Sequence, residues 1–270
     1  MLPGQRGISA LRRQLSKPPH RWIEAKGVGL GLHRAARVMR HVAAGIDRIH
    51  AAGMIHRDIK PGNVLVDGDD VRVSDLGYCA ILDDHGTASP NGTWQTVAPE
   101  AASGNRCSIA SDVYSLGATA FFTYSGEYPV STYMGLEDQV ARIKAGHLRE
   151  LRDLAPHVPQ SVANVIRKAL QLDPKDRHQS ADEFGNALVG AMEGRRDWSR
   201  ISHAGHVLCV RGERFKTKAS VVICGEPDGP NVRLIARHQA SNRRVQGLSD
   251  RVVPHDRVPT ELRTIVATLS

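Results

Sequence analysis

The sequence is poor in cysteine and has no long apolar run, and these two absences exclude several classes of protein. Its longest apolar segment, from Val113 to Tyr124, is shorter than the roughly 20 residues that a membrane-spanning helix needs. The first residues also lack the apolar stretch of a secretory signal. The sequence therefore predicts a soluble, cytoplasmic protein with no membrane span.

The cysteines lie too far apart in the sequence to predict a disulfide framework or a zinc site. There are four of them, namely Cys79, Cys107, Cys209 and Cys224. They stand far apart and form no C-x-x-C pair, so neither a zinc site nor a disulfide framework is predicted. His203 and His206 lie close together in the sequence, but we expect no cysteine or carboxylate set near them that would complete a metal site.

Charge is unevenly distributed. The whole chain carries 36 Lys and Arg against 28 Asp and Glu, a formal charge of +8. From Arg195 onward there are 14 basic and 7 acidic residues, so nearly all the excess lies there. This segment could bind acidic partners, including nucleic acid, through Arg233, Arg237, Arg243 and Arg244. A basic, well-solvated surface is the alternative that we favour.

Hydrophobic patterning divides the chain into three parts. Residues 1–32 are rich in Pro, Gly and Arg and show no period. Residues 33–195 predict helices over 33–53, 111–124, 135–144, 159–172 and 180–192, and a β-hairpin over 63–73. Residues 196–270 predict strands at 206–210, 219–224 and 232–237 and a helix over 260–269. The predicted fold is therefore a mainly α-helical domain with a small β-hairpin, followed by a small, basic, β-rich α+β module of unknown role.

The segment H-R-D-I-K-P-G-N, from His56 to Asn63, is the most informative part of the sequence. Because a hairpin returns the chain to its starting end, we expect Asn63 and Asp75 to lie near the loop that holds Asp58 and Lys60. Carboxylate and amide oxygens are the ligands that Mg²⁺ prefers. Lys60 can neutralise a phosphoryl group, and Asp58 can accept the proton of an attacking hydroxyl.

The order of these residues resembles the catalytic loop and metal-binding turn of the eukaryotic-like serine/threonine protein kinases, in the style of the bacterial members. Ala98-Pro99-Glu100 resembles the family's A-P-E motif, and Gly92-Thr93 stands before it like the family's G-T. Asp112 stands where the family has an aspartate that braces the catalytic loop, and Arg177 where an arginine pairs with the A-P-E glutamate. The set covers residues 33 to 192, which correspond to the large lobe of the family.

The resemblance implies an ATP-dependent protein serine/threonine kinase, which transfers the γ-phosphoryl group of ATP to a Ser or Thr hydroxyl of a protein substrate. It implies that Asp58 is the base, that Lys60 is the cation facing the transferred phosphoryl group, and that Asn63 and Asp75 are the Mg²⁺ ligands. Lys60, Asn63, Leu65 and Asp75 would contact the nucleotide. Leu65 would touch the adenine ring, although a plain core position in the hairpin is an alternative.

Other residues of the pattern are expected to have structural or regulatory roles. His56 and Leu76 are predicted to pack the floor of the pocket, and Glu100 with Arg177 to form a structural ion pair. Thr87 and Ser89 are either phosphorylation sites that would order the loop through Arg57, or ordinary loop hydroxyls.

The small lobe of a kinase is not recognisable in this sequence. Only 55 residues precede His56, and the predicted helix uses most of the later ones. Five strands, one helix and their loops would need on the order of 65 residues. Residues 1–32 resemble at best the end of the hinge. We therefore expect a kinase chain that is weakly active alone, with another chain or segment supplying the small lobe. The alternative is a non-catalytic pseudokinase that serves as an interaction scaffold.

Overall fold

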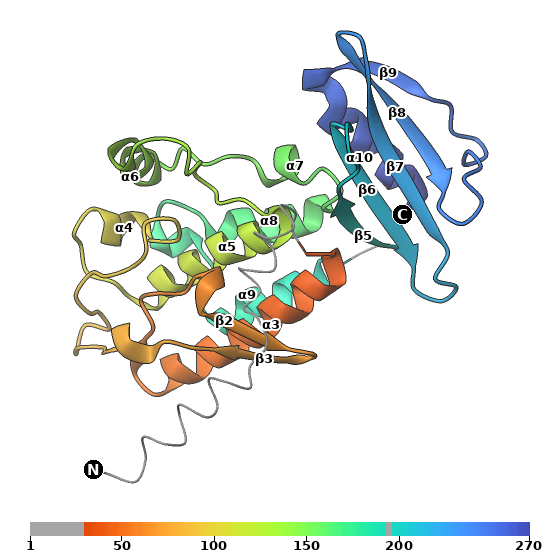
Figure 1. The fold of residues 1–270 in the computed structure, drawn as a ribbon. Coiled ribbons are helices and arrows are strands. Elements are labelled where there is room, and N and C mark those ends of the chain that lie inside the picture. Colours follow the sequence, from red (N-terminus) through yellow and green to blue (C-terminus); the bar gives the residue numbers. More distant parts are fainter. Residues whose placement is uncertain (1–29, 193–195) are drawn as a thin grey trace, which may run out of the picture.

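The computed structural model describes residues 30–192 and 196–270. These residues form two parts that lie side by side, one mainly helical and one built on a β-sheet (Figure 1). The predicted hinge remnant lies outside the described residues except for its last three positions.

Helices dominate the first part. They are α3 (Leu32–Ala51), α4 (Pro99–Ala102), α5 (Ile109–Ser125), α6 (Leu136–Ala145), α7 (Leu151–Leu154), α8 (Gln160–Ala169) and α9 (Ala181–Gly190), with short 3₁₀ turns at Pro61–Asn63, Leu76–Tyr78 and Pro174–Asp176. Two antiparallel strand pairs accompany them, β1 (Met54–Ile55) with β4 (Ala80–Ile81) and β2 (Val64–Asp67) with β3 (Asp70–Val73). The helices predicted from the sequence are all present, with ends that differ by a few residues.

α3 and α5 form the centre of this part. α3 buries residues at helical spacing, among them Val38, Val42 and Ile46, and its arginines lie between them. α5 is buried along almost its whole length, because α3, α8 and α9 pack around it. After α3, Gly53 adopts a φ of +72°, which favours glycine and turns the chain into β1.

The β2–β3 hairpin forms as predicted. Val64 pairs with Val73 and Asp67 with Asp70, and Gly68 takes a φ of +60° in the turn. In this register the end of β3 lies beside the start of β2. The backbone N–H of Ser74 donates to the carbonyl of Asn63 at 2.8 Å. The hairpin thus brings the start of β2 and the end of β3 together, as the sequence predicted.

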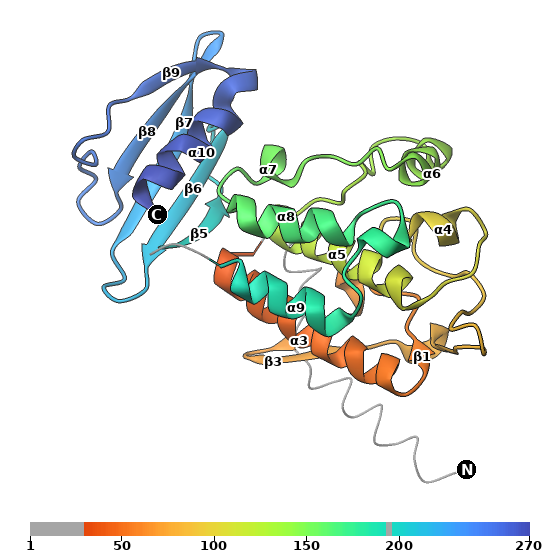
Figure 2. The ribbon, with the colours of Figure 1, turned by 180° about the vertical axis from the view of Figure 1, so that it is seen from behind.

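The second part is an antiparallel sheet in simple sequential order. Its strands are β5 (Arg196–Ile201), β6 (Leu208–Arg214), β7 (Ser220–Asp228), β8 (Asn231–His238) and β9 (Arg251–Pro254), followed by a 3₁₀ turn (His255–Arg257) and α10 (Val258–Leu269). Alternate residues such as Val210, Ile223 and Leu234 are buried on one face, which α10 covers (Figure 2). Three of these strands and the helix were predicted. β5 and β9 were not predicted, because β5 has only Trp198 and Ile201 as apolar residues and β9 is only four residues long.

The sheet meets the beginning of α3, far from the predicted catalytic loop. The backbone N–H of His33 donates to Asp197 Oδ1 at 3.1 Å, and the His33 ring meets the ring of Phe215 edge-on at 4.3 Å. Arg263 of α10 donates to Asp153 at 2.5 Å. A helix of 20 residues is about 30 Å long, and Asp58 follows the other end of α3. The sheet therefore does not lie over Asp58.

Antiparallel pairing also brings together residues that the sequence kept apart. Cys209 of β6 stands directly opposite Cys224 of β7, and His203 and His206 lie beside them. The prediction that no cysteine lies near these histidines was wrong, because strand register, rather than a short sequence spacing, places the two thiols side by side.

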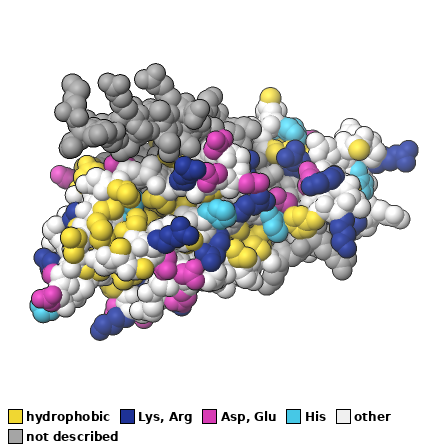
Figure 3. Space-filling model, turned by 90° about the horizontal axis from the view of Figure 1, so that it is seen from below, with side chains coloured by type: hydrophobic (Ala, Val, Ile, Leu, Met, Phe, Trp, Pro, Cys, Tyr) yellow, Lys and Arg dark blue, Asp and Glu magenta, His cyan; other side chains and the backbone are white. Residues whose placement is uncertain are grey.

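The basic excess of the second part is partly neutralised where it lies. Arg233 pairs with Asp228 at 2.9 Å, and Arg244 pairs with Asp250 at 2.8 Å. On the face of the molecule seen in Figure 3, basic side chains lie among acidic ones rather than forming one continuous patch. Whether this part binds nucleic acid or only presents a solvated surface stays a prediction. Within the residues that the structure describes, none of the helices is both long and apolar enough to cross a bilayer.

Candidate active site

The loop from His56 to Asn63 is held by one buried carboxylate at the start of α5. Asp112 is only 1% exposed, and its oxygens accept hydrogen bonds from the backbone N–H groups of His56 at 2.7 Å and Arg57 at 2.9 Å. His50 Nε2 lies 2.9 Å from the same carboxylate. Arg57 has a φ of +65°, a conformation that costs free energy in a non-glycine residue. The two hydrogen bonds to Asp112 hold the backbone in this conformation, so Asp112 occupies the bracing position that the sequence predicted for it.

Asp58 lies at the centre of a compact polar cluster. Its Oδ2 accepts from Lys60 Nζ at 2.7 Å and from Asn63 Nδ2 at 3.0 Å. Its Oδ1 accepts from Thr93 Oγ1 at 2.5 Å, and Lys60 Nζ also donates to Thr93 Oγ1 at 2.8 Å. Asp58 is 3% exposed, whereas the Lys60 side chain is 29% exposed. The carboxylate is therefore fixed in direction, while the ammonium group next to it still reaches solvent.

Thr93 reaches this cluster because a glycine precedes it. Gly92 has a φ of +149°, and a Cβ there would lie 3.0 Å from the Val97 side chain and 3.3 Å from the carbonyl oxygen of Arg57. Any side chain at this position would force the loop away from Arg57. The sequence marked Gly92-Thr93 only as part of a motif, and the hydrogen bond from Thr93 to Asp58 adds a positioning role.

Asn63 precedes β2 and Asp75 follows β3, at the end of the hairpin opposite its turn. Asn63 is 7% exposed, and its amide Nδ2 also donates to the backbone oxygen of Asp58 at 2.8 Å. Since the nitrogen is used in this way, the amide oxygen is the atom left to face a cation. Asp75 is exposed and follows Ser74, whose hydroxyl donates to the Asn63 carbonyl at 3.0 Å. A carboxylate and an amide oxygen at one edge are a donor set that fits Mg²⁺.

The apolar residues near Asp75 differ in exposure. Leu65 is partly buried within the hairpin. His56 is fully buried, as predicted, but Leu76 is 58% exposed and Tyr78 is 45% exposed. The prediction that Leu76 packs the floor of the pocket was wrong, because it follows Asp75 into a 3₁₀ turn whose residues are all exposed.

Glu100 and Arg177 form the predicted ion pair. Arg177 donates through Nη1 and Nη2 to the two oxygens of Glu100, each at 2.8 Å. Burial by itself raises the pKa of Glu100, but the hydrogen bonds and charge of Arg177 and the hydroxyl of Ser111 together hold that pKa below its ordinary value. Three backbone carbonyls, those of Ala110, Gln171 and Leu172, accept the remaining guanidinium hydrogens. The pair joins α4 to the turn before α9 and has no contact with Asp58.

The loop after Asp75 is tied down by two arginines. Arg57 Nη1 donates to the hydroxyl of Ser89 at 2.9 Å and to its carbonyl at 2.8 Å. Arg106 Nε donates to Thr87 Oγ1 at 2.7 Å. Both hydroxyls that the sequence singled out therefore lie beside a cation, but whether either is phosphorylated stays a prediction.

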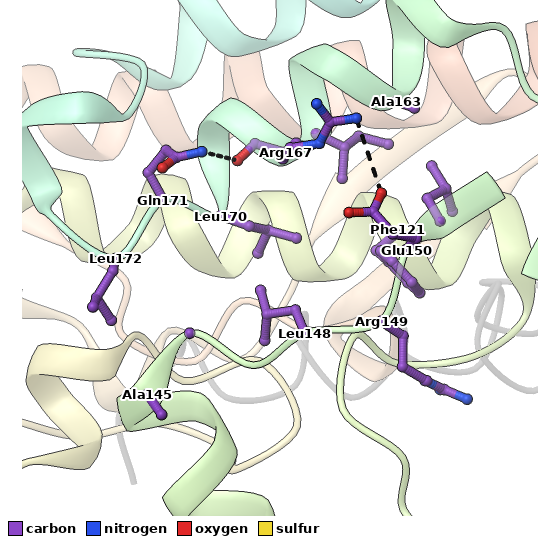
Figure 4. Close-up of a pocket in the computed structure, with 13 residues that line it drawn as sticks. Phe121, Ala145, Leu148, Arg149, Glu150, Ala163, Arg167, Leu170, Gln171 and Leu172 are labelled. Atoms are coloured by element: carbon purple, nitrogen blue, oxygen red, sulfur yellow. Dashed lines mark hydrogen bonds and ion pairs between the residues drawn. The ribbon is translucent and has the colours of Figure 1, made fainter. Parts of the chain in front are cut away.

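A pocket of about 310 Å³ lies elsewhere in the helical part (Figure 4). It is lined by residues of α5, α8 and the segment after α6, including Phe121, Leu148 and Leu170. Gln171 Nε2 donates to the Arg167 carbonyl at its rim at 3.3 Å. None of the predicted site residues lines this pocket, so it is separate from the Asp58 cluster.

Comparison with known proteins identifies the family of the chain. The sequence profile described as the protein kinase domain matches residues 15–186. The chain therefore belongs to the protein kinase family.

Similar proteins include several bacterial kinases. Over 172 residues the chain is 33% identical to the serine/threonine-protein kinase PknA of Mycobacterium tuberculosis, covering 62% of this chain and 39% of PknA. Over 189 residues it is 35% identical to the serine/threonine-protein kinase PknJ of Mycobacterium bovis, covering 65% of this chain and 32% of PknJ. The chain thus spans about two fifths or less of the length of these relatives. Among solved structures, it is similar to the Rad53 kinase domain in complex with AMPPNP, with a TM-score of 0.48, 26% identity and 59% of each chain covered.

Proposed function

We propose that this chain carries the catalytic residues of a protein serine/threonine kinase that uses ATP and Mg²⁺. The observation that carries the proposal is the cluster around Asp58, which joins a fixed carboxylate, a solvent-reaching ammonium group and a carboxamide within direct hydrogen-bond distance. The two kinase relatives are named as serine/threonine-specific, which supports a protein Ser or Thr hydroxyl as the acceptor.

The chemistry follows from the groups in the cluster. The hydroxyl of the substrate donates a hydrogen bond to Asp58, so its oxygen points a lone pair at the γ-phosphorus of ATP. A new O–P bond forms, the bond between the γ-phosphorus and the bridging oxygen of ADP breaks, and the hydroxyl proton passes to Asp58. Lys60 stabilises the negative charge on the transferred phosphoryl oxygens, since its ammonium group lies 2.7 Å from the base.

Asn63 and Asp75 are the residues that would hold Mg²⁺. Mg²⁺, when bound, neutralises phosphate charge and orients the β- and γ-phosphates. Asn63 has a second task, because its amide nitrogen fixes Asp58 through the carboxylate and the backbone oxygen. Leu65 lies within the same hairpin, where its partly buried side chain could meet the adenine ring.

Removal of the Asp58 charge tests the proposal. ATP labelled at its terminal phosphate is incubated with the chain, Mg²⁺ and a generic Ser/Thr-containing acceptor protein. We expect Asp58→Asn to abolish the measured transfer, whereas Asp69→Asn, which removes an 87% exposed carboxylate at the tip of the hairpin, leaves it unchanged. Equal transfer by wild type and Asp58→Asn would contradict the assignment. A complete absence of transfer and of nucleotide binding under all conditions would instead favour a pseudokinase scaffold.

We further propose that the 270-residue chain needs a small lobe from another chain or segment for full activity. Two observations support this. The described sheet lies at the far end of α3 from Asp58, and Leu76 and Tyr78 beside Asp75 expose apolar surface. Without a small lobe over the nucleotide, water would weaken each charge interaction with the phosphates.

Complementation in trans tests this second step. We expect slow transfer by the chain alone and faster transfer after addition of a small lobe from a related kinase. A variant with polar replacements at the exposed apolar positions, Leu76→Ser and Tyr78→Ser, should respond less to the added lobe. Rapid transfer by the chain alone, unchanged by the added lobe, would refute the requirement.

A further inference from the structure

Four metal-ligating side chains lie together on the sheet of the second part, away from the Asp58 cluster. They are His203, His206, Cys209 and Cys224, and one ligand atom from each lies within 4.8 Å of those of all the others. The sequence placed no metal site here. We infer that these four residues bind a zinc ion in tetrahedral Cys₂His₂ coordination.

The strands bring the two sulfur ligands together. Cys209 and Cys224 stand directly opposite each other in the antiparallel β6–β7 ladder, so their side chains project from the same face. Val210 and Ile223, their neighbours in the next register position, are buried in the core. The two cysteines therefore lie on the opposite face of the sheet from α10. Neither is oxidised to a disulfide in the structure.

A tight turn between β5 and β6 supplies the two nitrogen ligands. The backbone N–H of His206 donates to the carbonyl of His203 at 3.2 Å, and Gly205 between them has a φ of +77°. A second backbone hydrogen bond, from Val207 to Gly225 at 2.9 Å, ties the turn to β7. The turn is thus held against the strand that carries Cys224, and both imidazoles lie over the thiols.

The distances between the ligand atoms are close to those of a zinc site, so only small shifts of the side chains are needed. His203 Nδ1 lies 3.2 Å from Cys224 Sγ, and His206 Nδ1 lies 3.3 Å from Cys209 Sγ. Zinc bonds of about 2.3 Å to sulfur and about 2.0–2.1 Å to nitrogen, at tetrahedral angles, separate neighbouring ligand atoms by about 3.5 Å. All four positions would be filled by protein atoms, which is the arrangement of a structural zinc site rather than a catalytic one.

The types of ligand favour zinc over other metal ions, and they favour a metal site over a disulfide. Two thiolates with two imidazoles suit zinc and disfavour Mg²⁺ and Ca²⁺, which take oxygen ligands. A Cys209–Cys224 disulfide is the competing use of the two sulfurs. It would not account for the approach of one imidazole to each sulfur, whereas zinc coordination uses all four groups.

Binding would stabilise the second part. Each thiol loses its proton to solvent when its sulfur coordinates the metal, and zinc then links the β5–β6 turn to β6 and β7. Because the four ligands are not held together in the unfolded chain, zinc should bind the folded state preferentially and raise the unfolding temperature.

Metal content and a cobalt spectrum test the inference on the full chain. The protein is purified without chelators from zinc-supplemented cells, and its zinc content is measured by inductively coupled plasma mass spectrometry. We expect one zinc ion per chain, and a chelator should lower the unfolding temperature. Replacement of zinc by Co²⁺ should give the visible absorption of tetrahedral cobalt together with thiolate-to-cobalt charge transfer in the near ultraviolet.

Variants with matched controls make the test specific. Both Cys224→Ser and His203→Asn should lose the bound zinc. With Co²⁺, Cys224→Ser should weaken the thiolate charge-transfer absorption, and His203→Asn should weaken the visible absorption of tetrahedral cobalt. His203 is exposed, so its replacement leaves the core of the sheet intact. Cys79→Ser and His238→Asn remove a thiol and an imidazole outside the cluster and should keep the metal.

Three results would overturn the inference. One is a chain that contains no zinc and gives no tetrahedral cobalt spectrum with CoCl₂. Another is zinc that is retained equally by the cluster variants and by the controls. The third is a Cys209–Cys224 disulfide, found by thiol counting and peptide mass mapping in protein purified under reducing as well as ambient conditions.

Discussion

Removal of the Arg177 guanidinium should be among the most destabilising single changes outside the catalytic cluster. The side chain is fully buried, and the guanidinium meets both oxygens of Glu100, three backbone carbonyls and the ring of Tyr114, whose centroid is 5.0 Å away. Arg177→Met keeps most of the apolar stem but leaves Glu100, 15% exposed, without its counter-ion. Loss of one partner from a buried pair costs about 3–5 kcal/mol.

Urea unfolding followed by circular dichroism measures this loss. A matched control is Arg72→Met, which breaks the Arg72–Asp70 pair, half exposed on both sides, and should lower the free energy of unfolding far less, because water screens an exposed pair. The double variant Glu100→Gln with Arg177→Met should lose less free energy of unfolding than the sum of the losses of the two single variants, because no unpaired carboxylate is left buried. A loss for Arg177→Met no larger than that of Arg72→Met would refute the reasoning.

The same pair gives a pH dependence with a defined sign. The folded-state pKa of Glu100 lies below its ordinary value. Its contribution to stability is therefore complete above the ordinary carboxyl pKa of about 4.3 and is lost as the pH falls through the lowered value. In the Arg177→Met chain this part of the acid sensitivity should disappear.

Three further changes test other parts of the fold and site. Burial, with Arg200 nearby, lowers the pKa of His157 to about 3, and neither ring nitrogen has a hydrogen-bond partner. Because the unfolded chain then binds the extra proton, the free energy of unfolding should fall between pH 6.5 and pH 3, by up to roughly 5 kcal/mol. His157→Leu should flatten this decline in urea unfolding at several pH values, and an identical decline in both chains would contradict it. Asp112→Ala leaves the buried N–H of His56 and the partly buried N–H of Arg57 without an acceptor, so it should cost about 2 kcal/mol and slow labelled phosphate transfer. A stable variant with full transfer would disprove the bracing role. In Gly212→Ala, the new Cβ would lie 2.8 Å from the ring of Trp198, so chemical denaturation should show a loss of about 1–3 kcal/mol, whereas an unchanged midpoint would mean that the ring moves aside freely.

Local patterns in the sequence were sufficient to predict most of the helical part. The spacing of Val38, Val42 and Ile46 identified α3, because a helix of 3.6 residues per turn buries one face. The D-G turn identified the hairpin, and the hairpin in turn required the ends of β2 and β3 to meet. For the same reason the sequence predicted that Asn63 and Asp75 would lie at one edge of the fold.

Contacts between residues distant in the sequence were decided only by the tertiary structure. The hydrogen bond from Thr93 to Asp58 depends on how the loop after β4 folds back over the catalytic loop. The exposure of Leu76 depends on how the 3₁₀ turn after Asp75 lies against the rest of the described chain. Neither has a signature of fixed spacing, so neither could be derived from local periodicity.

The cysteine and histidine cluster shows the same limit most clearly. Fourteen residues separate Cys209 from Cys224, and this spacing belongs to no common metal motif. The cluster exists because the register of β6 against β7 sets the two thiols opposite each other and because the turn at Gly205 folds both histidines onto them. The sequence determined the ligand types, while strand pairing, a long-range interaction, determined that they meet.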